Sequence, residues 1–502
     1  MKSARSLVLI TVDCFRADHA GFLGYPLPTT PFLDSLATES LTFSNAIVAG
    51  APTYFSFPAV MASRYPLGLG RDVVGLAPGE PTIASASNEA GHATAAFLAA
   101  NPYLSPHFGY DAGFSVFQEF LDFDTATGPG VSDSAKSTRR LSRWNQGLAK
   151  VSHATGPVGA LYDELYFQYC QRLASVPAPS LDQLRRFPAA DVIVDHARDW
   201  LTGIAGRPFF LWAHFMDPHS PYYPRREALE LIGHDSLDAS RARYLNSYWN
   251  RGDLGASRLR RHRKDIVTLY DAGIRWVDAQ VARLVDTLQG LGVWENCVMA
   301  VTADHGEEFL DHGGRYHPPS TVSEELVRVP LLLRAPGLPP GTAGAPFSLL
   351  HLAPTLLDLA EVPAPDSFRG RSHAALLEAA KGGENDAVIE CIAGCENPFV
   401  VEDRLQARLL AVREARYKMV LDFSSATERL YDLDADPGER RPLPPGAEKP
   451  ARRRLLDRAR QHISDAVQSR DTEHRMAARL RDLRLAASAR IVQPHRPDLR
   501  LA

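Results

Sequence analysis

Short apolar runs alternate with segments of helical periodicity over most of the chain. Each run is about one strand long and ends in polar or turn-forming residues, which predicts buried strands at 7–12, 93–98, 208–214, 297–302 and 329–334. The clearest helix is predicted between Ile266 and Leu288, where apolar residues repeat at helical spacing. Alternation of strands and helices is typical of an α/β fold, so we expect a mostly parallel central sheet between helices.

The pattern changes after Pro354. Four short apolar runs separated by polar turns predict a small antiparallel subdomain, with strands at 388–392, 409–412, 417–421 and 429–433. The tail is rich in Arg and Leu, with helical stretches such as 476–485, and is interpreted either as an oligomerisation arm or, more simply, as a helix packed on the body. We therefore predict three parts: a large domain at 1–385, the subdomain at 386–445 and a helical tail at 446–502. Charged segments near 120–200 and 225–262 are interpreted as insertions that shape a substrate pocket.

The composition changes this picture little. Hydrophobic residues make up 45% and charged residues 23%, and the net charge of −4 gives no reason to expect nucleic acid or an anionic membrane as a partner. The five cysteines are scattered and odd in number, which does not indicate a disulfide framework; Cys391 and Cys395 are most simply two buried thiols, although a disulfide or a metal site is an alternative. Because the run at 7–12 is too short for a signal peptide, and no run approaches the ~20 apolar residues of a spanning helix, we expect a cytoplasmic protein without a membrane span.

Candidate chemistry gathers where the predicted strands end. Asp13 follows the first run, and Asp304 with His305 follows the apolar run that begins at Cys297. His219 lies just after another strand, and His317 a short loop after His305. Open α/β sheets place their sites at the carboxyl ends of the strands, and carboxylate and imidazole groups together suit divalent metals. The spacing therefore predicts a metal site formed by Asp13, Asp304 and His305.

A hydroxyl beside such a metal becomes a nucleophile at neutral pH. Thr53 lies in a turn-rich segment that leads into a predicted helix, whose backbone N–H groups would attract an anionic group. His219 and His317 would then neutralise the anion or protonate a leaving oxygen. Each residue also has a purely structural alternative: Asp13 and Thr53 as helix caps, His219 and His317 as loop residues. Asp217 and His312 are expected at the surface or behind the site.

With these motifs in view, the chain resembles the sulfatase branch of the alkaline phosphatase superfamily from Leu7 to about Leu443. Further matching segments are Thr29-Thr30-Pro31-Phe32-Leu33-Asp34, the helix segment 270–278, Val329-Pro330-Leu331, Ala353-Pro354-Thr355 and Leu430-Tyr431-Asp432-Leu433 with Asp436-Pro437-Gly438-Glu439. The resemblance implies an alkaline phosphatase-like α/β fold and a catalytic domain at 1–385. It also implies one divalent ion (Mn, Zn, Ca or Mg) held by Asp13, Thr53, Asp304 and His305.

The chain departs from the family's pattern at the residues that would meet the anion. Ala62-Ser63-Arg64-Tyr65-Pro66 resembles the family's Thr-Gly-Arg-Tyr-Pro, and counting back from it puts Thr53 at the position of the formylglycine precursor in Cys-x-Pro-x-Arg, with Phe57 at the Arg position. Formylglycine is therefore not expected. Cys14 stands where the family has a second aspartate. Asn101 and Tyr103 stand where the family's Lys-x-His grips sulfate, and we expect them to contact the substrate.

A threonine nucleophile resembles the phosphate-transferring relatives, which include phosphodiesterases. We therefore predict a metal-dependent hydrolase that cleaves phosphate esters (diester, monoester or phosphonate) or sulfate esters through Thr53. The alternatives are a phosphoryl-group transferase of the same superfamily and a binding protein that has lost catalysis. A small-molecule or glycan ester is the expected substrate, and an oligomer is possible.

Overall fold

The structure is a computed structural model. It describes residues 4–71, 73–121, 180–204, 206–234, 236–375, 386–468 and 473–481. Most of the predicted 120–200 insertion and Cys170 lie outside the described residues. The predicted 225–262 insertion contains the helices α8 (Arg226–Leu231), α9 (Ala239–Trp249) and α10 (Ala256–Leu259). Among the described helices, none is long and apolar enough to cross a bilayer.

A nine-stranded sheet organises the larger domain. Its main path runs β10 (Gly341–Ala343), β2 (Leu41–Ile47), β9 (Arg328–Arg334), β6 (Cys297–Ala303), β1 (Ser6–Val12), β5 (Phe209–Phe215), β3 (Ala93–Leu98) and β4 (Val116–Gln118), and β11 (Phe347–Ser348) pairs with β2. The neighbours β6, β1, β5, β3 and β4 are parallel, while β9 is antiparallel to both β6 and β2. The predicted mostly parallel sheet is therefore confirmed.

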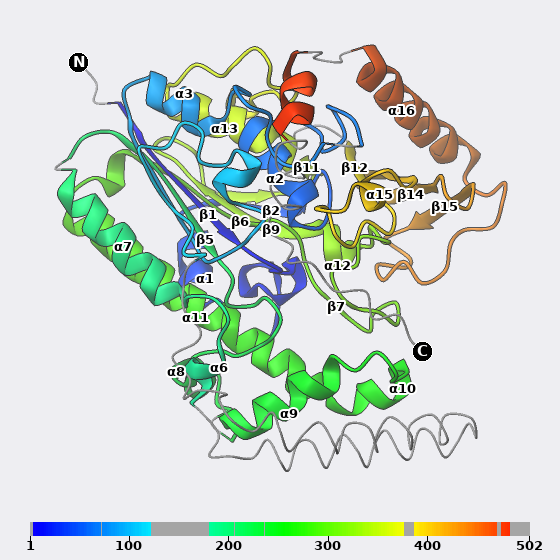
Figure 1. The fold of residues 1–502 in the computed structure, drawn as a ribbon, viewed down its shortest axis with the longest axis horizontal. Coiled ribbons are helices and arrows are strands. Elements are labelled where there is room, and N and C mark those ends of the chain that lie inside the picture. The colour runs from blue at the N-terminus through cyan, green and yellow to red at the C-terminus, as the bar shows by residue number, and fades with distance from the viewer. Residues whose placement is uncertain are drawn as a thin grey trace, which may run out of the picture.

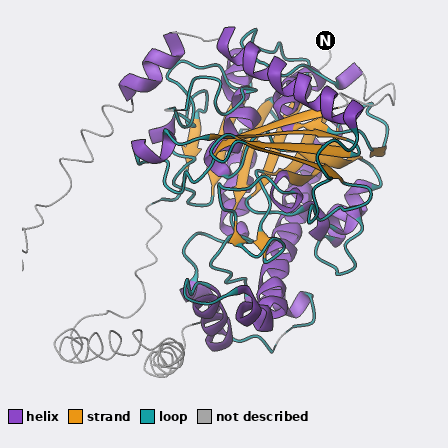
Figure 2. Cartoon of the chain, turned by 90° about the vertical axis from the view of Figure 1, so that its right-hand side faces the viewer, coloured by secondary structure: helices purple, strands orange, loops and turns teal. Residues whose placement is uncertain are grey.

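Helices cover both faces of this sheet (Figures 1 and 2). One layer contains α1 (Pro31–Ala37), α7 (Ala190–Gly203) and α11 (Arg263–Gly290), and the opposite layer contains α2 (Thr53–Ala62), α3 (Ile83–Glu89) and α13 (Leu352–Leu359). The long helix α11 includes the predicted 266–288 segment, and its apolar face is buried because it packs against α7 and α1. The strands β1, β5 and β6 are buried along their whole lengths, which explains their continuous apolar sequences.

A four-stranded antiparallel sheet forms the C-terminal part, in the order β12 (Asp386–Ile392), β13 (Arg408–Glu414), β14 (Tyr417–Asp422) and β15 (Thr427–Asp432). Helix α16 (Lys449–Gln468) packs on it, because Ala451, Leu455 and Ala459 share a core with strand residues such as Leu410 and Met419. Residues 473–481 are helical as well, and the rest of the predicted stretch 476–485 lies outside the described residues. The division into three parts at 385 and 445 stays a prediction.

A buried lysine connects the small sheet with helix α12 (Glu324–Val327) of the larger domain. Lys418 of β14 is completely buried, and its Nζ lies 3.1 Å from Glu324 Oε1 of α12 and 2.9 Å from Glu439 Oε1. Burial opposes its charge, but the two carboxylates outweigh burial and raise the pKa of Lys418. The ammonium group is therefore shared by both acids, and Glu324 also pairs with Arg413 at 3.3 Å.

We expect Lys418→Ala to lower the free energy of unfolding by about 3–5 kcal/mol, because it leaves buried carboxylates short of a cation. Urea denaturation of the two proteins measures the difference. Lys449→Ala, at an exposed lysine that begins α16, is the matched control and should change stability by no more than about 0.5 kcal/mol. A loss for Lys418→Ala no larger than that of the control would contradict the argument.

Candidate active site

The carboxyl ends of four adjacent parallel strands meet at one edge of the sheet. The register aligns Val12 of β1 with Phe215 of β5 and Ala303 of β6, and Leu98 of β3 with His214. The residues that follow these ends are brought to the same level of the edge. Asp13, Asn101, Asp304 and His305, which come from β1, β3 and β6, are all buried there.

Thr53 is the first residue of α2, a helix whose ten residues are all buried. Its hydroxyl donates to Asp304 Oδ2 over 2.8 Å and lies 3.1 Å from His305 Nε2. Backbone N–H groups at a helix N-terminus favour negative charge nearby. The predicted nucleophile therefore lies beside the predicted metal ligands, at the end of the helix that an anion prefers.

Asp13 and Asp304 flank the imidazole of His305, whose Nε2 lies 3.7 Å from Asp13 Oδ1 and 3.5 Å from Asp304 Oδ2. Burial would raise the pKa of the Asp13 carboxyl, but the nearby imidazoles, with His219 the strongest, hold that pKa well below its usual range. The pKa of Asp304 is raised, because burial and the negative charge of Asp13 act in the same direction.

This donor set fits a divalent cation. Within the described ranges, the ion-pair partners of Asp13 and Asp304 are histidines. Two buried carboxylates, one imidazole and one hydroxyl converge, and ligand atoms of Asp13, Cys14 and His305 lie within 4.8 Å of one another. Buried carboxylates of this kind are normally paired or bound to metal, so the residues present match the ligand set expected from the sequence.

The rings of His219 and His317 lie against each other at a tilt of 47°, with centroids 5.1 Å apart. Both line a pocket of about 490 Å³ that also reaches Thr53, Asn101 and Tyr103. Burial lowers the pKa of His219. For His317 burial acts in the same direction, but the nearby carboxylate of Glu307 outweighs it and raises the pKa.

All eight predicted site residues are thus brought together, although Asn101 takes an unexpected position. Its amide donates to Asp13 Oδ2 over 2.9 Å and so supports that carboxylate directly. Of the two positions expected for Asp217, the surface is excluded, because this residue is buried and pairs with Arg185 at 2.8 Å. His312 is paired with Glu325 Oε1 at 2.7 Å.

Two buried residues of the site carry no role in the sequence prediction. Glu307 accepts from the Tyr222 hydroxyl over 2.7 Å and contacts His317 Nδ1 at 2.9 Å. His214 of β5 lies 3.5 Å from Asp13 Oδ2 and contacts Thr11 Oγ1 through its Nδ1. Glu307 directly follows the Asp-His-Gly motif in the sequence, and this proximity is a signal that could identify it as a site residue. The signal for His214 is weaker, since it is a single polar residue in an apolar strand.

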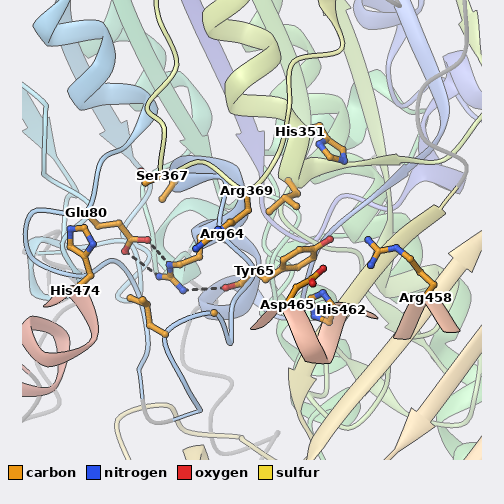
Figure 3. Close-up of a pocket in the computed structure, with 14 residues that line it drawn as sticks. Arg64, Tyr65, Glu80, His351, Ser367, Arg369, Arg458, His462, Asp465 and His474 are labelled. Carbon is orange, nitrogen blue, oxygen red and sulfur yellow. Dashed lines mark hydrogen bonds and ion pairs between the residues drawn. The ribbon is translucent and has the colours of Figure 1, made fainter. Parts of the chain in front are cut away.

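A second pocket, of about 350 Å³, lies beside α16 (Figure 3). It is lined by Arg64, Tyr65 and His462 among others, and none of the predicted site residues lines it. Its charged groups are paired within the protein: Arg64 with Glu80, and His462 with Glu390. The pair of His462 with Glu390 attaches α16 to the body, as does the pair of Arg458 with Asp386 at 3.0 Å.

Comparison with known proteins agrees with the geometry. The family model "Sulfatase" matches residues 5–362, and the model "N-sulphoglucosamine sulphohydrolase, C-terminal" matches residues 314–465. An arylsulfatase of Clostridium perfringens (strain 13 / Type A) is 26% identical over 397 residues, which are 74% of this chain and 78% of the relative. A choline-sulfatase of Rhizobium meliloti (strain 1021) is 28% identical over 250 residues, and that match spans only 46% of each protein.

Solved structures share the fold. A protein in complex with its substrate D-glucosamine-2-N,6-O-disulfate superimposes with a TM-score of 0.63 at 16% identity, covering 94% of this chain and 99% of that one. A phosphonate monoester hydrolase of Agrobacterium radiobacter superimposes with a TM-score of 0.60 at 20% identity, covering 93% and 96%.

The predicted fold class and the predicted assignment to a family of sulfate and phosphate ester hydrolases are both confirmed by these matches. Most of the chain is covered by the family model, and the strand-end residues lie within the part that it covers. The chain belongs to the sulfatase family.

Proposed function

We propose that this protein is a metal-dependent hydrolase of phosphate esters (diester, monoester or phosphonate) or sulfate esters, with Thr53 as its nucleophile. The observation that carries the proposal is the position of the Thr53 hydroxyl: 2.8 Å from Asp304, at the N-terminus of α2, in a pocket shared with two histidines. The divalent ion would be held by Asp13, Asp304, His305 and Thr53, where it would lower the pKa of the hydroxyl and offset charge on the ester.

The chain's own residues would carry the transfer as follows. Thr53 Oγ1, whose proton would be released to solvent because the ion lowers its pKa, forms a bond to phosphorus or sulfur, and the bond from that atom to the leaving oxygen breaks. Thr53 regains a proton from solvent when it is released. The N-terminus of α2 holds the non-bridging oxygens of the ester. His219 or His317 donates a proton to the leaving oxygen, and water then releases the acid from Thr53 with the same histidine accepting its proton.

Phosphate chemistry is favoured by the residues that differ from the sulfatase pattern. Thr53 is not a precursor of formylglycine, and Asn101 and Tyr103 replace the basic residues that grip sulfate in the family. Tyr54, Tyr103 and Tyr316 line the pocket and offer flat apolar surfaces to an aryl group or a sugar ring. A small-molecule or glycan ester is therefore proposed as substrate, and a cytoplasmic location stays a prediction.

The reaction class is tested by steady-state hydrolysis of matched aryl esters by metal-reconstituted protein: a sulfate, a phosphate monoester, a phosphodiester and a phosphonate monoester. We expect turnover of at least one phosphorus ester, and turnover of the sulfate that is slower. Preferred turnover of the sulfate would reverse the substrate preference, and no turnover of any ester by folded, metal-loaded protein would favour a binding protein instead.

A further inference from the structure

Cys14, His219 and His317 form a second cluster of metal-binding side chains beside the Asp13 site. One ligand atom from each of the three lies within 4.8 Å of the others. Cys14 is completely buried, and its Sγ lies 3.1 Å from Asp13 Oδ1 and 3.4 Å from His317 Nδ1. The cluster therefore adjoins the carboxylate expected to bind the first ion, and both histidines face the same pocket as Thr53.

The backbone at Cys14 is held in an unfavourable conformation that aims the thiol into this cluster. Cys14 has a φ of 62°, in the left-handed region that residues with a Cβ rarely adopt. The Tyr270 hydroxyl donates to the Cys14 carbonyl over 2.7 Å and accepts from the backbone N–H of Arg16 over 2.9 Å, which fixes the loop. Backbone strain that the surrounding structure enforces is characteristic of functional sites.

A buried carboxylate orients the cluster from behind. Glu307 lies 2.9 Å from His317 Nδ1, and the Tyr222 hydroxyl holds its other oxygen at 2.7 Å. Cys14 Sγ lies near the same nitrogen, so Nε2 is the nitrogen of His317 left for an ion. A carboxylate on the other nitrogen fixes the ring and is the usual support of a metal-bound imidazole. Glu307 also adds a buried negative charge beside Cys14 and His317, so a second cation would be better balanced here than in a neutral site.

We propose that Cys14, His219 and His317 bind a second divalent cation beside the ion of the Asp13 site. The chemistry of these ligands favours Zn²⁺. One thiolate and two imidazoles are a ligand set that suits Zn²⁺ and disfavours Ca²⁺ and Mg²⁺, which prefer oxygen. Binding would release the thiol proton to solvent. This inference deepens the proposed function and rests on it. With the second ion bound, His219 and His317 would hold that ion instead of transferring protons, and the ion would face the same ester and offset the charge on its leaving oxygen.

Titration of the metal-free full-length protein with Co²⁺ tests the proposal, because cobalt bound to a thiolate gives a charge-transfer absorption in the near ultraviolet that oxygen and nitrogen ligands do not give. We expect two equivalents of Co²⁺ per chain, with the charge-transfer band rising with one of them, and displacement of both by Zn²⁺. A single equivalent, or two equivalents without the band, would overturn the proposal.

Variants assign the band to its ligand. Cys14→Ser should abolish it, whereas Cys14→Asp should lose the band but keep a second equivalent through an oxygen ligand. Glu307→Gln should weaken the second equivalent by about 10- to 100-fold. Cys297→Ala, at a buried cysteine at the opposite end of β6, is the matched control and should leave the spectrum unchanged.

A band that survives Cys14→Ser, or one that vanishes in Cys297→Ala, would overturn the assignment. If Cys14→Ser does not fold, loss of the band in Cys14→Asp makes the same assignment. The outcomes also separate the two proposals: a thiolate band with no ester turnover would refute the function alone, and turnover with one ion and no band would refute the second site alone.

Discussion

Replacement of Thr53 by alanine should lower kcat/KM for the best ester substrate by about 10⁴-fold or more, because removing a nucleophile leaves only binding and electrostatic stabilisation. Thr53→Ser should retain measurable turnover, since it keeps a hydroxyl at the start of α2. Steady-state kinetics on metal-loaded wild-type and variant proteins measures both effects. Mass spectrometry of the wild-type protein should find an unmodified threonine at this position.

Thr38→Ala, at an exposed threonine just after α1, is the control for a threonine-to-alanine change and should have wild-type kinetics. The Thr53→Ala protein should fold, with a loss of stability of at most about 1–3 kcal/mol from the unpaired Asp304 oxygen. Turnover that is indifferent to Thr53 in a folded variant would remove the nucleophile assignment and leave a water-mediated hydrolysis to be explained.

The buried strands could be predicted because the physics of a parallel sheet marks its sequence. Strands such as β1 and β6 are covered on both faces and must be apolar throughout, so their runs were visible. Strand β2 was missed because Ser44 and Asn45 interrupt it at an irregularity in its pairing with β9. The short strands β4 and β10 are partly exposed and have no apolar pattern to detect.

The ligands at the strand ends could be predicted for a similar reason, since the chain order of polar residues after apolar runs identifies the edge of the sheet. Contacts between residues distant in sequence could not. The edge-to-face contact between Phe57 and His214, with centroids 5.4 Å apart, is an example. Where the family has an arginine, this chain places an aromatic ring against a buried histidine that lies 3.5 Å from Asp13. Only the fold shows that the loss of one basic residue is accompanied by a buried imidazole near Asp13.

Removal of the metal should abolish ester turnover and also lower the free energy of unfolding. Asp304→Asn should show that this stability comes from the bound ion. In the metal-free protein, Asp13 and Asp304 are buried like charges, which is part of the reason that the pKa of Asp304 is raised. Neutralising Asp304 relieves that repulsion, so the metal-free variant should be at least as stable as the metal-free wild-type protein. With metal bound, the wild-type protein should be the more stable of the two, because the variant has lost a metal ligand.

Thermal or urea unfolding of both proteins, with and without a series of divalent ions, measures this crossing. For the wild-type protein, an ion at about 100 times its Kd should raise the free energy of unfolding by about 2.7 kcal/mol, and the variant should gain much less. Asp195→Asn, on the exposed side of α7, controls for the loss of a carboxylate and should respond to metal as the wild-type protein does. Equal stabilisation of wild-type and Asp304→Asn proteins would show that the ion binds elsewhere, and the ligand set of Asp13, Asp304 and His305 would then have to be abandoned.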